Sequence, residues 1–347
     1  MPRQTEAAVL FETSQPLRLV TLSIPELKPG QLLVDIAYGG VCRSQLLEVR
    51  GKRGPDRFLP HTLGHEGSGT VLEVGAGVTK VKPRDRVVLS WIKGGGADVS
   101  STIYQSTQGP INSGAISTFM RQTVTCENRV TPIPDIMPLR EAALLGCAIP
   151  TGAGIVLNTA KVQPGSSIAI FGVGGIGLSA VLAADLVHAT TIIAVDLFDH
   201  KLEQARRVGA THTINAFQQD PLEVILDITK GHGVDYAIEA SGERQVMEIA
   251  FQAVHDNGGL CVLAGNLPHG ERISLDPFNL IKGKRIVGTW GGEALPDRDI
   301  PMYVRLFLSG KLKLDELITH IYSLDNINQA LEDLECGKVG RALIDMS

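Results

Sequence analysis

Three side chains of the kind that bind metals lie far apart in this sequence: Cys42 in GGVCRSQLLEV, His65 in LGHEGSG and Cys147 in LLGCAIPTG. Two thiolates and one imidazole suit a zinc ion whose fourth position stays open for water or substrate. A lone cysteine is, however, often a small buried residue, and a lone histidine is often a hydrogen-bonded structural one. The spacing alone leaves Cys42 open to three interpretations: a core residue, a redox thiol or a metal ligand.

A second chemical signal is the stretch FGVGGIG, in which Gly172, Gly174 and Gly177 follow an apolar run and precede a helical pattern. In a strand–turn–helix unit, the second glycine lets the backbone approach a pyrophosphate, and the helix N-terminus offers free N–H groups. The spacing predicts a dinucleotide-binding turn. The alternative is that these glycines serve only tight packing of a helix on a strand.

An acidic residue supports the dinucleotide hypothesis. Asp196 closes the next strand pattern, nineteen residues after Gly177, where a carboxylate can accept hydrogen bonds from the adenosine ribose hydroxyls. The residues that follow, Leu197 and Phe198, supply no arginine for a 2′-phosphate. These features favour NAD over NADP.

The elements that must position these residues are of two kinds. Residues 1–150 contain short β-branched runs separated by KPG and GAG turns, which is typical of a β-rich domain. After them, strand patterns alternate with helical ones, which predicts a parallel, doubly wound sheet. We therefore expect residues 1–150 and 294–347 to form a catalytic domain and residues 151–293 to form a dinucleotide-binding domain.

Two segments are expected to lack regular structure: the stretch 91–114 and the EALPDRDIP stretch that follows residue 292. The stretch 91–114 is rich in Gly, Ser and Thr without a period, and is expected to be a long loop. Residues 283–292 are expected to form the last strand of the parallel sheet, followed by a proline-broken loop, EALPDRDIP, that leaves this edge uncovered. An uncovered edge favours pairing with a second copy of the chain across a two-fold axis.

Composition and charge limit the partners. The 347 residues include 37 acidic and 32 basic side chains, which give a net charge of −5 without a basic block. This composition argues against nucleic acid or an anionic membrane as a binding partner.

The N-terminus lacks the apolar run of a secretory signal, so a cytoplasmic location is expected. Proline, polar residues and glycines interrupt the uncharged stretches 142–160 and 166–184, which argues against membrane spans. Five dispersed cysteines without a CxxC pair do not indicate a disulfide framework.

Ordered motifs over essentially the whole chain decide among these hypotheses. The motifs GVCRS, GHEGSGTVLEVGAGV, RDRV, GCAIPTG, FGVGGIGLSAVLAA, AVDLFDHKLEQARRVGA and GKVGRALI together resemble the zinc-dependent alcohol dehydrogenase branch of the medium-chain dehydrogenase/reductase superfamily. The resemblance implies an α/β chain, with a β-rich GroES-like catalytic domain and a Rossmann domain that binds NAD. It also implies that Cys42, His65 and Cys147 hold one catalytic Zn²⁺.

The resemblance implies further roles. Ser44 is similar to the family's hydroxyl that takes the proton from the alcohol, and Glu66 is similar to the acid beside the metal. Arg43 and Arg341 match cations that face the cofactor pyrophosphate, and Thr151 matches a residue near the nicotinamide. The full set of implied cofactor contacts is Arg43, Thr151, Gly172, Gly174, Gly175, Ile176, Gly177, Asp196, Lys201 and Arg341.

Three positions depart from the family pattern. The lobe that holds a second, structural zinc in many relatives corresponds to 91–114, which contains no cysteine, so one zinc per chain is expected. Gln45 replaces the usual aspartate that orients the zinc-binding histidine, and a neutral amide can still hydrogen-bond that ring. Leu47 replaces a histidine that ends the proton relay in several relatives.

The leading hypothesis is a zinc- and NAD-dependent enzyme that oxidises an alcohol, a polyol or a sugar-type hydroxyl to a carbonyl. The polar stretch 91–114, if it borders the site, favours a hydroxyl-rich substrate. The alternatives are a zinc-free, NADPH-dependent quinone or enone reductase of the same superfamily and a non-catalytic, dinucleotide-binding structural protein. The expected partners are a small-molecule alcohol or carbonyl and further copies of the chain, in a homodimer or homotetramer.

Overall fold

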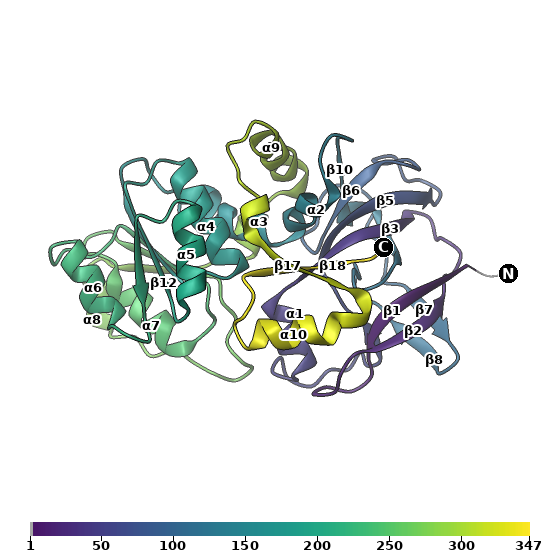
Figure 1. The fold of residues 1–347 in the computed structure, drawn as a ribbon, viewed down its shortest axis with the longest axis horizontal. Helices are drawn as coiled ribbons and strands as arrows, with labels where there is room; N and C mark the ends of the chain where they lie inside the picture. Colours follow the sequence, from purple (N-terminus) through teal and green to yellow (C-terminus); the bar gives the residue numbers. More distant parts are fainter. Residues whose placement is uncertain (1–2) are drawn as a thin grey trace. The chain divides into compact units, whose positions relative to one another are not determined.

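The computed structural model describes residues 3–347, which form two compact units (Figure 1). The first unit contains the residues up to Cys147, together with Leu295–Ser309 and Ile318–Ser347. The second unit contains Ala148–Ala294 and Gly310–Leu317. Each unit has a hydrophobic core of its own, so each buries apolar surface independently.

The first unit consists of a closed barrel and a larger sheet. The barrel has the strand order β1-β2-β7-β8-β4, and the seven-stranded sheet has the order β10-β6-β5-β3-β18-β17, with β9 also paired to β3. The strands are β1 (Gln4–Leu10), β2 (Arg18–Ser23), β3 (Gln31–Val41), β4 (His61–Thr62), β5 (Glu66–Val74), β6 (Arg86–Ser90), β7 (Ile103–Ser106), β8 (Gly109–Asn112), β9 (Gln122–Cys126), β10 (Val130–Ile133), β17 (Ile318–Ser323) and β18 (Arg341–Asp345). The helices are α1 (Arg43–Val49), α2 (Leu139–Ala142), α9 (Pro296–Leu308) and α10 (Ile327–Glu335).

Strand β3 organises the larger sheet. Its apolar sequence is buried along most of its eleven residues, and it pairs antiparallel with both β5 and β18. Because antiparallel neighbours run in opposite directions, the C-terminal end of β3 lies beside the first residues of β5 and β18. Residues from three distant parts of the sequence therefore meet at one end of this sheet.

The stretch 91–114 is not a continuous loop, so that prediction is wrong in part. Residues within it form the hairpin β7–β8, and β7 and β8 belong to the barrel. Tyr104 and Ile111 are fully buried in the barrel core, and the Val124 N–H donates to the Tyr104 hydroxyl at 2.7 Å. Two apolar side chains spaced across a tight turn are enough to anchor a hairpin whose other residues are polar.

The rest of this stretch is held by two carboxylates. Glu127 accepts hydrogen bonds from the N–H groups of Thr79, Lys80 and Ala97, at 2.6, 2.7 and 2.9 Å. Asp297 accepts from the Gly95 N–H at 2.6 Å and forms an ion pair with Lys80. These contacts tie Gly95 and Ala97 to the start of α9 and to the segment between β9 and β10.

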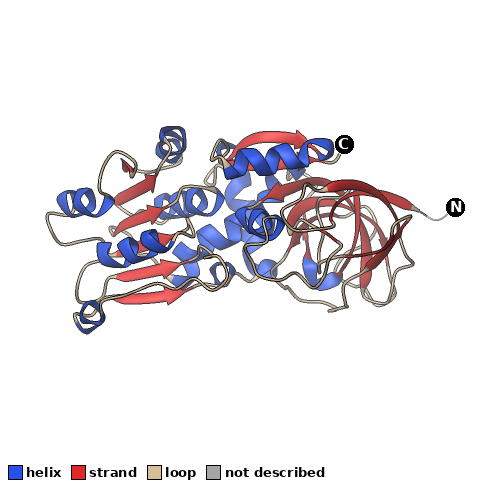
Figure 2. Cartoon of the chain, turned by 90° about the horizontal axis from the view of Figure 1, so that it is seen from below, coloured by secondary structure: helices blue, strands red, loops and turns tan. Residues whose placement is uncertain are grey.

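The second unit is a parallel, doubly wound sheet, as the alternating pattern predicts. Its strand order is β13-β12-β11-β14-β15-β16, and helices cover both faces (Figure 2). The strands are β11 (Ser167–Phe171), β12 (Thr191–Asp196), β13 (His212–Asn215), β14 (Tyr236–Glu239), β15 (Leu260–Leu263) and β16 (Arg285–Gly288). The helices are α3 (Ala148–Gly154), α4 (Gly175–Leu186), α5 (Asp199–Arg207), α6 (Pro221–Ile228), α7 (Arg244–Ala253) and α8 (Pro277–Ile281). This is the strand order of a Rossmann dinucleotide-binding fold, with its reversal between β11 and β14.

The end of this sheet confirms one prediction and overturns another. Strand β16 is the edge strand, as expected from residues 283–292. The EALPDRDIP stretch, however, leads into helix α9 rather than a loop. Pro296 stands in the first turn, where a missing N–H costs nothing, and the buried side chains of Ile300, Tyr303 and Val304 recur at helical spacing.

The uncharged stretch 142–160 is buried helical structure. Within residues 3–347, no helix by itself has the length and apolar character needed to cross a bilayer. The two helical segments Leu139–Gly146 and Ala148–Thr159 satisfy that test only when taken together, and they meet at a bend of 56°. Their residues are largely buried among other parts of the protein.

Candidate metal centre and dinucleotide turn

Cys42 lies at the junction of β3 and α1. It is the N-cap residue of α1, and its own N–H donates to the Gln45 Oε1 at 2.9 Å. This is half of a capping box, in which the side chain at the third helical position returns to the cap backbone. Gln45 therefore fixes the backbone of Cys42 and makes no hydrogen bond to His65, which corrects the role expected for it.

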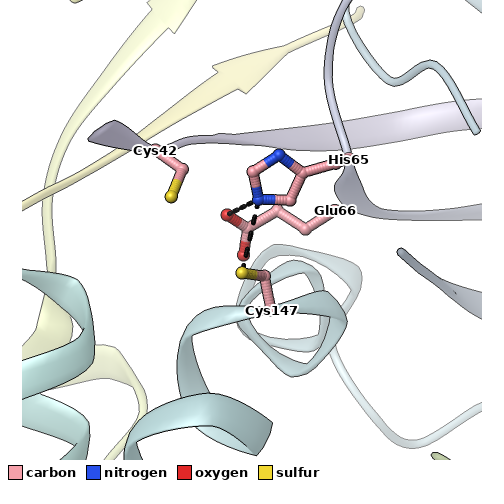
Figure 3. Close-up of side chains that lie close together, drawn as sticks. All are labelled: Cys42, His65, Glu66 and Cys147. Carbon is pink, nitrogen blue, oxygen red and sulfur yellow. Dashed lines mark hydrogen bonds and ion pairs between the residues drawn. The ribbon is translucent and has the colours of Figure 1, made fainter. Parts of the chain in front are cut away.

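The other cysteine and the histidine come from different elements and converge on Cys42 (Figure 3). His65 directly precedes β5, and Cys147 lies between the short helix Ala143–Gly146 and α3. His65 Nε2 is 3.3 Å from the Cys147 Sγ and 4.0 Å from the Glu66 Oε1. One ligand atom from each of Cys42, His65, Glu66 and Cys147 lies within 4.8 Å of all the others.

The cluster has the donor set and spacing of a zinc site. In a tetrahedron, zinc–sulfur bonds of about 2.3 Å and zinc–nitrogen bonds of about 2.0 Å place a nitrogen and a sulfur ligand about 3.5 Å apart, and two sulfur ligands about 3.8 Å apart. The 3.3 Å between His65 Nε2 and Cys147 Sγ agrees with that spacing. The thiol of Cys147 and then the ring of His65 hold the pKa of Cys42 well below its ordinary value, although burial opposes this. A thiolate is the form that binds a metal.

Glycines make room for the acid beside the cluster. A Cβ on Gly40 would lie 2.6 Å from the Glu66 Cδ, and one on Gly146 would lie 2.3 Å from the Leu89 carbonyl oxygen. Neither position tolerates a side chain, because both contacts are far inside van der Waals distance. The chain thus keeps Glu66, which is fully buried, directly behind the three ligands.

Ser44 stands next to two of the three ligands. Its hydroxyl lies 3.4 Å from the His65 Nδ1 and donates to the Cys42 Sγ at 3.5 Å. With Nε2 of His65 bound to a metal, the Nδ1 would carry the ring proton and could donate it to the Ser44 oxygen. Ser44 thereby takes the place beside the ring that Gln45 does not fill.

Arg341 lies behind Glu66. It starts β18, is 4% exposed, and forms an ion pair with Glu66. Its Nη1 also donates to the Val41 carbonyl oxygen at 3.0 Å. Burial lowers the pKa of Arg341, and the negative charge of Cys42 opposes that shift. An arginine in such a place balances the charge of the buried Glu66 carboxylate, which would otherwise lack a counter-charge.

The glycine turn has the geometry expected of a dinucleotide site. Gly172 has a φ of +83°, a region that favours glycine, and a Cβ on Gly177 would lie 2.0 Å from the Gly172 carbonyl oxygen. Gly174 is the N-cap of α4, and a Cβ there would meet no atom within 4 Å. Gly172 thus allows the tight turn, Gly174 leaves space for a pyrophosphate to approach the backbone, and Gly177 allows the helix to pack closely on the strand. These are the three roles of the glycines in this motif.

Four more residues that are expected to contact the cofactor lie in the second unit: Gly175, Ile176, Asp196 and Lys201. Gly175 and Ile176 are the first residues of α4, whose N–H groups lack partners within the helix. Asp196 ends β12 and accepts from the Val173 N–H at 2.9 Å, which ties the acid to the turn. Lys201 lies with its Nζ 4.9 Å from the centre of the Phe198 ring.

Three expected cofactor residues lie outside this turn: Arg43, Thr151 and Arg341, the last of which forms the buried ion pair with Glu66. Arg43 is exposed at the start of α1 in the first unit. Thr151 is a buried residue of α3 in the second unit, and its hydroxyl has no hydrogen-bond partner among the described residues. An unpaired buried hydroxyl is free to hydrogen-bond to a ligand.

The sequence did not lead us to predict the contributions of Gly40, Gly146 and Gln45 to the site. A glutamine three residues after the N-cap of a helix is, however, a recognisable capping signal.

Comparisons with known proteins agree with this geometry. The family described as "Zinc-binding dehydrogenase" matches residues 175–309, and the "Alcohol dehydrogenase GroES-like domain" matches residues 28–135. The S-(hydroxymethyl)glutathione dehydrogenase of Synechocystis sp. is 34% identical over 98% of this chain and 99% of its own length.

Two solved structures are also similar to this chain. The benzyl alcohol dehydrogenase of Acinetobacter calcoaceticus has a TM-score of 0.91 and 32% identity, covering 99% of this chain and 100% of its own. An alcohol dehydrogenase zinc-binding domain protein of Burkholderia ambifaria has a TM-score of 0.92 and 33% identity, with both chains covered in full.

Proposed function

Because this chain belongs to the zinc-dependent alcohol dehydrogenase branch of the medium-chain dehydrogenase/reductase superfamily, we propose that it oxidises an alcohol to a carbonyl compound with one zinc ion and NAD. The observation that carries the proposal is the convergence of Cys42, His65 and Cys147, with ligand atoms within 4.8 Å. Three segments that lie far apart in the sequence supply two thiolates and one imidazole as metal ligands. A four-coordinate zinc ion with these three ligands would have its fourth coordination position free for water or substrate. The glycine turn and Asp196 support NAD as the second cofactor.

In the proposed mechanism, Cys42, His65 and Cys147 hold the metal and leave room for the substrate oxygen. When bound, the zinc polarises that oxygen as a Lewis acid, and the nicotinamide accepts the hydride. Ser44, whose Oγ lies 3.4 Å from the His65 Nδ1, accepts the hydroxyl proton of the alcohol. Because Leu47 cannot carry a proton further, Ser44 would give up a proton to water as it accepts one from the alcohol. Glu66 and Arg341, as a buried ion pair beside the ligands, balance each other's charge.

The substrate remains an alcohol of unassigned structure in this proposal. The similar proteins act, by their names, on S-(hydroxymethyl)glutathione and on benzyl alcohol. The polar stretch 91–114 no longer favours a hydroxyl-rich substrate, because its centre is a hairpin anchored in the barrel core. A screen of NAD⁺ reduction with primary, secondary, aromatic, polyol and sugar alcohols and with S-(hydroxymethyl)glutathione tests the proposal.

The same screen separates the proposal from its alternatives. A zinc-free reductase would contain no metal and would consume NADPH with quinones or enones. A structural dinucleotide-binding protein would quench NADH fluorescence but turn over none of these compounds. The proposal fails if purified protein holds no zinc and reduces NAD⁺ with none of the alcohols.

We propose further that the chain forms a homodimer, or a tetramer built from such dimers, through the edge strand β16. This strand leaves one row of backbone groups unpaired within the second unit. Exposed apolar side chains lie near it in sequence, with Ile281 and Trp290 each 77% exposed. Pairing with a second copy satisfies both edges at once and covers apolar surface.

A further inference from the structure

Glu239 is a buried acid at the place where doubly wound sheets bind their ligands. It is the last residue of β14 and is 0% exposed. In the sheet register it lies opposite Phe171, the residue directly before the Gly172 turn. The strand order reverses between β11 and β14, so this acid stands at the topological switch point. The mechanism proposed above does not use it.

One carboxylate oxygen of Glu239 holds the loop that follows its own strand. Its Oε1 accepts hydrogen bonds from the Ser241 N–H at 2.7 Å, the Ser241 hydroxyl at 2.5 Å and the Gly242 N–H at 2.8 Å. Gly242 has a φ of +74°, so the loop turns sharply there. These three hydrogen bonds to one carboxylate oxygen fix the backbone of Ser241. A hydrophobic side chain in place of Glu239 could form none of them.

That loop is the surface on which the glycine turn rests. A Cβ on Gly172 would lie 2.8 Å from the Ser241 nitrogen and 2.9 Å from its Cα. The Ala240 N–H also donates to the Phe171 carbonyl oxygen at 2.8 Å. Any shift of Ser241 therefore changes the room available to Gly172, and with it the position of the N–H groups at the start of α4.

The second oxygen of Glu239 has no hydrogen-bond partner among the described residues. Oε2 is fully buried, and a Cβ on Gly265 would lie 2.6 Å from it. A carboxylate used only to stabilise the fold would normally satisfy both oxygens. Burial raises the pKa of Glu239, while the Ser241 hydroxyl and the N–H groups of Gly242 and Ser241 act in the opposite direction. One oxygen of this buried carboxylate is thus used by the Ser241–Gly242 turn, and the other has no partner among the described residues.

We propose that Glu239 is a positioning residue for the dinucleotide site: its buried carboxyl fixes the Ser241–Gly242 turn against Gly172 and so sets the phosphate-binding backbone. It acts through that backbone and does not itself touch the cofactor. This inference rests on the proposed use of the glycine turn for NAD. Losing Glu239 should weaken cofactor binding without changing the chemistry at the zinc ligands, because those ligands lie in the first unit.

The test compares Glu239→Ala and Glu239→Gln with a matched control, Asp235→Ala. Asp235 precedes the same strand, and its carboxylate accepts from the Ser167 N–H at 2.7 Å and the Ser167 hydroxyl at 2.6 Å. It makes the same kind of clamp at the opposite end of the sheet, away from the glycine turn. Each purified variant is measured for NADH and ADP-ribose affinity, zinc content, and KM for NAD⁺ and kcat with the best alcohol from the substrate screen.

Glu239→Ala should raise the dissociation constants of NADH and ADP-ribose by about tenfold or more, because two backbone N–H groups lose their buried acceptor. The KM for NAD⁺ should rise with them, while kcat at saturating NAD⁺ and zinc content stay unchanged. Glu239→Gln keeps an acceptor oxygen and should restore affinity to within about threefold. Asp235→Ala should lower the unfolding temperature and leave both affinities unchanged.

The outcomes separate this inference from the proposed function. If wild-type protein binds neither NADH nor ADP-ribose, the cofactor assignment itself fails. If wild type binds both and Glu239→Ala binds them equally well, the positioning role is wrong. The role is also wrong if Glu239→Ala has a lower kcat only because a smaller fraction of the protein is folded, while its KM for NAD⁺ equals that of wild type. It is wrong as well if Asp235→Ala weakens NADH binding as much as Glu239→Ala does.

Discussion

Arg341 and Glu66 form an ion pair in which the two side chains are 5% and 0% exposed, directly behind the three proposed zinc ligands. They belong to β18 and β5, the two strands that flank β3, so this contact joins both neighbours of the strand that ends directly before Cys42. A buried pair of this kind contributes little net stability but becomes costly when one partner is removed. The pair sets the electrostatic surroundings of the site.

The first prediction concerns this ion pair. Glu66→Gln should destabilise the protein by ~3–5 kcal/mol, because Arg341 keeps its charge without a buried partner. The double variant Glu66→Gln/Arg341→Met should recover a large part of that loss, since no buried charge remains unpaired. Denaturant unfolding of the two single variants and the double variant measures the coupling. Additive losses would show that the two side chains do not compensate each other.

The second prediction concerns the metal ligands. Cys42→Ser and Cys147→Ser should each lose zinc and turnover while keeping NADH affinity, because the glycine turn lies in the second unit. A strong chelator should have the same effect on wild type, and added zinc should reverse it. Zinc analysis, NAD⁺ reduction and NADH fluorescence are measured on the same preparations. Cys261→Ser, at a fully buried strand position, is the control and should keep its zinc. A zinc-free variant with more than about a tenth of wild-type activity would contradict the Lewis-acid role.

The third prediction concerns cofactor choice. Asp196→Ala should weaken NAD⁺ binding by ~1–3 kcal/mol, because ribose hydroxyls and the Val173 N–H lose their acceptor. It should also narrow the preference for NAD⁺ over NADP⁺, since the charge that repels a 2′-phosphate is gone. Asp196→Asn keeps an acceptor oxygen and removes only the charge, so it should change selectivity more than NAD⁺ affinity. Unchanged selectivity in both variants would assign discrimination to another residue.

The fourth prediction concerns the carboxylate that orders residues 95–97. Burial would raise the pKa of Glu127, but the N–H donors of Ala97, Thr79 and Lys80 outweigh it and lower that pKa. A lowered folded-state pKa gives stability that is fully present above the unfolded value of about 4.3 and is lost as the pH falls through the folded value. Glu127→Gln should therefore cost stability at pH 7 and progressively less in acid. Urea unfolding of wild type and variant at several pH values measures the difference, and a difference independent of pH would contradict it.

The fifth prediction concerns assembly. Wild type should sediment as a dimer or tetramer at micromolar concentration. A charge placed on the exposed edge, Val287→Lys, should shift it toward the 37.1 kDa monomer, because an unpaired lysine in the centre of a strand pairing is strongly unfavourable. Leu72→Lys, at an exposed apolar position in the first unit, is the control and should not change the mass. A wild-type monomer would rule out the proposed pairing.

Much of the second unit was predictable because its signals are local. Strand β11, the glycine turn, α4, β12 and Asp196 follow one another in sequence, and the geometry of each depends mainly on its immediate neighbours. The φ of Gly172 and the open position at Gly174 are properties of the turn itself. Local propensity and hydrophobic period are therefore sufficient there.

The errors lie where tertiary contacts outweigh local propensity. The hairpin β7–β8 exists because Tyr104 and Ile111 find a core that no pattern in 91–114 reveals. Helix α9 forms despite two prolines because its apolar face has a place to pack. Gln45 is the exception: it bonds to Cys42 rather than to His65 because this capping contact is local and needs no long-range packing.

The sequence by itself determined the residue types of the site, the dinucleotide turn and the two-part organisation, because these depend on composition, spacing and period. Only the tertiary structure decided that Cys42, His65 and Cys147 meet, that Arg341 neutralises Glu66, and that Glu239 braces the turn opposite Phe171. Those relationships follow from the pairing of β3 with β5 and β18 and of β11 with β14. Strand pairing between distant segments is set by the packing of the whole core, which no local stretch of sequence encodes.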